Sequence, residues 1–116
     1  MGDRVLVSFK SGEDVSPTIY MHSHGGEAAD WIKEAQPLMR KDDPSYAAAR
    51  FAGFCASKIP GTSGIGLIDA IDLSADLRDI THGDAGVYVV DVSTGKVEAG
   101  GGYGKPFKLD PSKFPD

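Results

Sequence analysis

Two histidines one residue apart, His22 and His24, are the residues whose types and spacing point most directly to chemistry. They follow an apolar run and precede two glycines. Residues two apart on a strand project from the same face, about 6.5–7 Å apart along the chain, so both imidazoles could bind one metal ion. The third histidine, His82, lies in the segment THGDAG, and Asp84 follows two residues later. Neutral imidazoles and a carboxylate are ligands that zinc accepts.

The sequence therefore predicts a divalent, zinc-like metal site, provided that the loop before residue 87 folds beside the end of the histidine-bearing strand. The predicted ligands are His22, His24, His82 and Asp84. A simpler interpretation is available, because a histidine pair on an exposed strand needs no ligand. The segment THGDAG has the composition of a turn, in which Gly83 and Gly86 supply positive φ. We favour this interpretation, in which the histidines are polar contacts at a strand end.

Under this second interpretation, the strand end and the glycine-flanked turns border a surface that contacts a protein or a small ligand. The expected contact residues are Tyr20, His24, Gly25, Gly26, His82, Gly83 and Asp84.

Two metal-binding families with a histidine pair do not fit the chain. JAMM-type metalloproteases require a serine and a metal-binding aspartate at fixed spacings, which fall here on Ile32 and Ala35. Cupins require a glutamate slightly beyond Glu27 within a barrel of many strands, and two predicted helices directly after the pair exclude that fold. Neither family is therefore supported.

Other catalytic or phosphate-binding patterns are incomplete. A strand leads through Gly25 and Gly26 into a predicted helix, but Glu27 and Asp30 place two carboxylates where a phosphate would bind. The chain has no GxSxG motif, and its single cysteine, Cys55, lies inside an apolar helical pattern without an activating neighbour. We therefore expect a protein that is not an enzyme and that needs no cofactor.

Composition limits the partners and the compartment. The chain of 116 residues has 12 basic and 17 acidic residues, and its net charge is −5. No basic cluster favours nucleic acid, and no apolar stretch approaches the roughly 20 residues that span a membrane. The start, MGDRVLVSFK, is unlike a signal peptide, and Leu6 occupies the place where myristoylation requires Ser or Thr. We expect a soluble, cytoplasmic protein with no nucleic-acid or membrane partner.

The hydrophobic periodicity predicts an α+β domain in the order ββααβββ, with a largely antiparallel sheet of about five strands and two helices on one face. Asp43 is the expected N-cap of the better-marked helix, 44–58, whose buried stripe is predicted to contain Phe51, Phe54 and Cys55. The expected strands cover 4–10, 15–24, 65–73, 87–92 and 96–99, and the other helix runs from about 26 to Pro37.

We expect one globular domain, 1–103, and an extended C-terminal arm, 104–116. The arm carries the apolar residues Phe107, Leu109 and Phe114, which need a surface to pack on. A neighbouring subunit is one such surface, so a homo-oligomer formed through the arm is predicted; packing on its own domain is the alternative.

Four stretches, MGDRVLVSF, YMHSHGG, SYAAARFAG and HGDAGVYVVDV, resemble a group of short uncharacterised proteins of prokaryotes, phages and plasmids. The resemblance implies a stand-alone accessory protein, encoded by a mobile element, and carries no activity or site residue. The sequence therefore predicts a small accessory or regulatory protein that binds a partner. The alternative is a metal-binding protein or a small metal-dependent hydrolase.

Overall fold

The computed structural model describes residues 2–59, 61, 64–79 and 83–116. It contains two α-helices and a seven-stranded sheet. The strands are β1 (Val5–Ser11), β2 (Asp14–Val15), β3 (Thr18–Met21), β4 (Ile65–Ile68), β5 (Gly86–Asp91), β6 (Lys96–Gly100) and β7 (Phe107–Lys108). The α-helices are α1 (Ala28–Ala35) and α2 (Pro44–Lys58). Single-turn 3-10 helices are η1 (Gly25–Glu27), η2 (Gln36–Leu38), η3 (Leu77–Asp79) and η4 (Pro111–Lys113).

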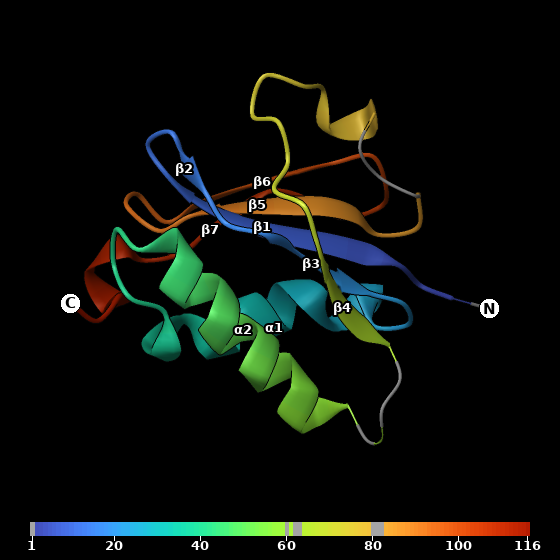
Figure 1. Ribbon diagram of the computed structural model, residues 1–116, viewed down its shortest axis with the longest axis horizontal. Coiled ribbons are helices and arrows are strands. Elements are labelled where there is room, and N and C mark those ends of the chain that lie inside the picture. The colour runs from blue at the N-terminus through green and yellow to red at the C-terminus, as the bar shows by residue number, and fades with distance from the viewer. Residues whose placement is uncertain (1, 60, 62–63, 80–82) are drawn as a thin grey trace.

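The sheet has the order β4-β3-β1-β5-β6-β7, and β2 pairs with the last residues of β1. Every neighbouring pair is antiparallel except β1 and β5, which run parallel with Val5 opposite Gly86. Figure 1 shows α1 and α2 on one face of the sheet, while the segment that contains η3 lies over the other face. The expected α+β class is confirmed, but the sheet has seven strands instead of about five, because β2 and β7 are added.

The strand expected over 15–24 is interrupted near Ser16. The Ser16 N–H donates to the Phe9 carbonyl oxygen at 2.8 Å, but the Phe9 N–H donates to the Ser16 hydroxyl at 3.0 Å and not to a backbone carbonyl. The next residue, Pro17, has no N–H to donate. The pairing therefore divides into β2 and β3, and β3 ends at Met21, before either histidine.

Helix α2 has the predicted bounds, Pro44–Lys58, because its start is encoded locally. The Asp43 carboxylate accepts a hydrogen bond from the backbone N–H of Tyr46 at 3.1 Å, which satisfies one of the free N–H groups of the first turn. Phe51 and Cys55 are fully buried as predicted. Phe54 is only half-buried, so that part of the prediction is wrong: the buried stripe runs instead through Ala47 and Ala48.

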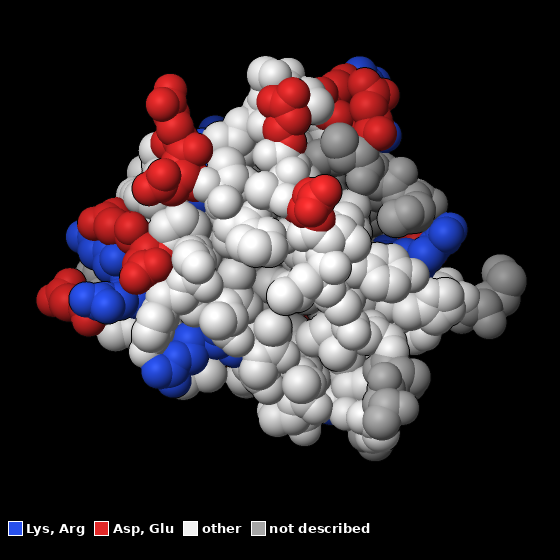
Figure 2. Space-filling view, viewed as in Figure 1, with Lys and Arg blue, Asp and Glu red and all other residues white. Residues whose placement is uncertain are grey.

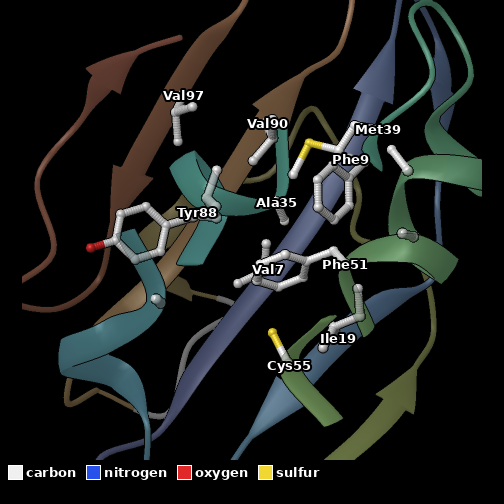
Figure 3. Close-up of a cluster of buried hydrophobic side chains, with 14 of the residues drawn as sticks. Val7, Phe9, Ile19, Ala35, Met39, Phe51, Cys55, Tyr88, Val90 and Val97 are labelled. Carbon is white, nitrogen blue, oxygen red and sulfur yellow. The ribbon is translucent and has the colours of Figure 1, made fainter. Parts of the chain in front are cut away.

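The main core lies between the sheet and the two helices, where alternate residues of β1, β3 and β5 point toward the helical layer (Figure 3). Phe9 and Phe51 pack edge to face, with ring centroids 5.5 Å apart. A smaller cluster on the opposite face is formed by Leu6, Val87 and Val89, and it is partly covered by Leu77 of η3. Both faces of the central strands are therefore apolar, which explains the nearly continuous hydrophobic run of β5.

The C-terminal segment, 104–116, packs on the rest of its own chain. β7 pairs with β6, and Leu109 and Phe114 are buried in the main core. The side-chain amide of Gln36 donates to the carbonyl oxygen of Asp110 at 2.6 Å. Leu109 and Phe114 are thus covered within the chain, Phe107 is half-buried, and self-association stays a prediction.

Charged side chains are unevenly distributed over the surface. Figure 2 shows that much of the face over α2 and β4 carries neither acidic nor basic side chains. Among the described residues, no helix combines the length and the apolar composition that a membrane span requires.

Candidate functional site

The predicted site residues that the structure describes lie at one end of the sheet. The parallel strands β1 and β5 both begin there, and β3 and β6 both end there. We define the loop end as residues 2–4, 22–27, 83–86 and 101–104, together with the adjoining side chains of Tyr20 and Trp31. In Figure 1 it is the end from which the chain emerges at its N-terminus.

Backbone hydrogen bonds hold the first residues of the chain between the two predicted glycine-flanked segments. The N–H of Asp3 donates to the carbonyl oxygen of His22, and the N–H of Gly25 donates back to the Asp3 carbonyl, both at 2.8 Å. On the other side, the N–H of Ala85 donates to the carbonyl oxygen of Arg4 at 3.1 Å. The two segments therefore adjoin the same short stretch of chain. The predicted metal site requires such proximity.

Glycine is needed at the loop end because backbones approach closely there. A Cβ on Gly25 would lie 2.7 Å from the Cβ of Ala85 and 2.7 Å from a carboxylate oxygen of Asp3. A Cβ on Gly102 would lie 2.2 Å from the carbonyl oxygen of Asp84. These contacts leave no room for a side chain, so the glycines fix the spacing of the four loop segments.

Asp3 joins three of these segments through its side chain. Its carboxylate accepts hydrogen bonds from the backbone N–H of Gly26 at 2.9 Å and from the Tyr103 hydroxyl at 2.6 Å. Desolvation of the phenol, followed by its hydrogen bond to the Asp3 carboxylate, raises the pKa of Tyr103 to about 12. The Tyr103 residue nevertheless remains 55% exposed, so its anchored ring is presented to solvent.

Arg4 and Asp84 form the ion pair of the loop end. Both the backbone N–H and the side-chain Nε of Arg4 donate to one oxygen of Asp84 at 3.0 Å. These two hydrogen bonds lower the pKa of Asp84, and the nearby imidazole of His22 lowers it further by a smaller amount. Asp84 also has a φ of 55°, which asparagine and aspartate tolerate better than most residues. Its carboxylate is thus already engaged by a cation.

His22 and His24 have different neighbours. The His22 imidazole shares a hydrogen bond with the Tyr20 hydroxyl at 2.9 Å, as expected for residues two apart on one face. His24 stacks on Trp31 of α1, with ring centroids 5.3 Å apart, and its Nδ1 lies 3.7 Å from the Glu27 carboxylate. The expectation that His22 and His24 project from one face of a strand is wrong, because β3 ends at Met21, before both residues.

No three potential ligands of the His, Cys, Asp or Glu type gather around a common point in the described part of the chain. His82, one of the four predicted ligands, lies outside the described residues. The predicted metal site is therefore not assembled from His22, His24 and Asp84 alone, and its complete form stays a prediction.

Cys55 lies on α2, outside the loop end. Its thiol is buried in the main core, and this burial raises the pKa of Cys55 to about 12. A thiol that stays protonated in an apolar environment is not a nucleophile. This agrees with the interpretation of Cys55 as a core residue.

Sequence reasoning missed four residues of the loop end: Asp3, Arg4, Trp31 and Tyr103. Trp31 lies on α1 beside the turn that carries His24, and its half-buried indole stacks on that imidazole. The partners of Asp3 and Arg4 lie 100 and 80 residues away, and no local pattern indicates such pairs.

Comparisons with known proteins add no relative. No protein-family model matches this chain, and no match was found among curated proteins or solved structures.

Proposed function

We propose that this protein is a non-enzymatic binding module that contacts a protein partner through the loop end. The observation that carries the proposal is the group of aromatic and histidine side chains that the loop end exposes, wholly or in part, to solvent. Tyr103 and His22 are exposed, and Tyr20, His24 and Trp31 are half-buried. Tyrosine, tryptophan and arginine are the residues that dominate the binding energy of protein interfaces.

These side chains are already fixed in the free protein. Asp3 anchors the ring of Tyr103, Trp31 supports the ring of His24, and Tyr20 hydrogen-bonds to His22. An aromatic side chain held in place loses little conformational entropy on binding, so more of its contact energy contributes to affinity. The loop end thus has the rigidity expected of a recognition surface.

Two ionisable groups of the loop end, Asp84 and Tyr103, favour binding over catalysis. A general base works best with a pKa near the operating pH. Here the Asp84 carboxylate is stabilised as an anion by Arg4, and the Tyr103 phenol has a pKa of about 12. Neither group is poised to exchange a proton near neutral pH. An accessory protein of a mobile element, as the resemblance implies, would act through such a surface.

The proposal is tested by affinity measurements with a partner purified together with the protein from its native host. Tyr103→Ala and His24→Ala remove surface rings without entering the core. We expect each to weaken binding by at least about 30-fold, the effect of a hot-spot residue. Lys108→Ala, on β7 at the other end of β6, is the control and should bind like wild type. Equal affinity of all three variants would contradict the proposal.

A metal-binding protein is the second candidate, and one observation favours it. Backbone hydrogen bonds hold Asp3 against the His22 segment and Arg4 against the Asp84 segment, so two of the predicted ligands come from segments that adjoin the same stretch of chain. A bound dication would compete with Arg4 for the Asp84 carboxylate. We therefore rank this candidate second.

A further inference from the structure

A surface pocket of about 290 Å³ lies near the C-terminus, on the opposite side of the molecule from the loop end (Figure 1). Its walls come from η2 and the residues after it, from the first turns of α2, and from the last two residues of the chain. Figure 2 shows basic and acidic side chains together at this side of the molecule. Its lining and the loop end have no residue in common.

Two guanidinium groups face one phenol in this pocket. The Cζ atoms of Arg40 and Arg50 lie 5.9 and 4.6 Å from the centroid of the Tyr46 ring. Arg50 also donates a hydrogen bond to the Tyr46 hydroxyl. Both positive charges therefore lie beside one side chain of the pocket, and both attract an anion bound there.

The two guanidinium groups of the pocket differ in their acidic neighbours. Arg40 lies 4.0 Å from the Asp43 carboxylate, at the limit of an ion pair. Within the described residues, no carboxylate lies within ion-pair distance of Arg50. A guanidinium has five N–H donors, and only one hydrogen bond from Arg50 is observed here. Donors therefore remain for a ligand, in a protein whose net charge is −5.

The walls of the pocket are held in place independently of any ligand. The N–H of Lys41 donates to the carbonyl oxygen of Pro115 at 2.8 Å, and Gln36 donates to the carbonyl of Asp110. Phe114, beside Pro115, is buried in the core. The C-terminal segment is thus fixed against the residues around η2, and the pocket is formed before binding.

We propose that this pocket binds a phosphomonoester whose organic part is small and apolar. A phosphate carries close to two negative charges at neutral pH, which matches two guanidinium groups better than a single carboxylate does. Pro37, Leu38 and Pro115 give the pocket apolar walls for the organic part. Asp116 opposes the phosphate electrostatically, because its carboxylate also lines the pocket.

The test is a titration of the full chain followed by ¹H–¹⁵N correlation spectra at constant ionic strength. The probes are phenyl phosphate, inorganic phosphate and benzoate. We expect saturable shifts at the amides of Tyr46 and Arg50, with phenyl phosphate binding more tightly than either of the others. Absence of saturation with phenyl phosphate, or equal affinity for benzoate, would overturn the proposal.

Substitutions distinguish specific binding in the pocket from nonspecific electrostatic attraction of anions. Arg40→Gln and Arg50→Gln should each weaken phenyl phosphate binding about tenfold, the worth of a charge-assisted hydrogen bond. Lys58→Gln makes the same charge change at the last residue of α2 and should leave the affinity unchanged. Asp116→Asn should tighten binding. An equal loss in Lys58→Gln and Arg50→Gln would show that only net charge matters and would overturn the proposal. Unchanged dispersion of the spectra verifies that each variant is folded.

Discussion

The carboxylate of Asp3 accepts a hydrogen bond from the hydroxyl of Tyr103 at 2.6 Å, although 100 residues separate the two in sequence. The same carboxylate accepts from the backbone N–H of Gly26. One side chain near the start of β1 therefore joins the turn after β3 to the glycine-rich turn after β6. This arrangement fixes the position of an exposed aromatic ring and defines the surface that we assign to binding.

Replacing Tyr103 by phenylalanine should remove one late step from the phenol titration followed by absorbance at 295 nm. The folded pKa of about 12 lies above the ordinary value of 10, so the protonated phenol is favoured by folding. Its contribution to stability is fully present below pH 10 and is lost as the pH rises through about 12. If the step lost in Tyr103→Phe lies near pH 10 instead of near 12, the Asp3 contact is contradicted.

Phe51→Ala should lower the free energy of unfolding by about 3–5 kcal/mol, because it empties a fully buried position against Phe9. Phe54→Ala, on the same helix but half-buried, is the matched control and should cost only about 1 kcal/mol. Urea denaturation measures both values. If both substitutions lowered the free energy of unfolding equally, α2 would pack a different set of side chains against the sheet.

Phe114→Ala tests whether the C-terminal segment packs on its own chain. The side chain is buried in the main core, so its removal should cost about 3 kcal/mol or more. Because Phe114 packs on a surface of its own chain, the melting temperature of the wild-type protein should not depend on protein concentration. A melting temperature that rises with concentration would instead support the self-association predicted from the sequence.

Zinc binding distinguishes the two candidate functions. We expect wild-type protein and Asp84→Asn to bind zinc equally weakly in calorimetric titrations, because Arg4 already occupies the Asp84 carboxylate. The asparagine keeps the shape of the side chain and tolerates its positive φ. A stoichiometric site in the wild type that is lost in both Asp84→Asn and His24→Ala would establish the predicted metal centre.

Local signals in the sequence determined the helices more accurately than the sheet. Asp43 and Pro44 mark the start of α2 directly, and its bounds are as predicted. The division of the second strand depends on a hydrogen bond from Phe9 to Ser16, which alternation of apolar residues does not encode. Likewise, periodicity shows that β1 and β5 are strands but not that they are parallel neighbours.

The candidate site could be predicted only in part, because local signals in the sequence indicate turns but not long-range contacts. Glycines beside His24 and Asp84 indicated where the chain turns sharply, and the segments that contain them lie next to each other. The side chains that hold this arrangement, Asp3 and Arg4, act on partners 100 and 80 residues away. Contacts at such separations depend on the topology of the sheet, which one sequence does not specify.

Site-specific photo-crosslinking in the native host tests most directly whether the loop end is the binding surface. A benzophenone amino acid is introduced at Tyr103, at His24 or, as a control, at Lys108 of β7. We expect an adduct of one common mass from the first two positions and none from the third. Adducts formed only from Lys108, or none from Tyr103 and His24 while the protein still co-purifies with its partner, would contradict the account.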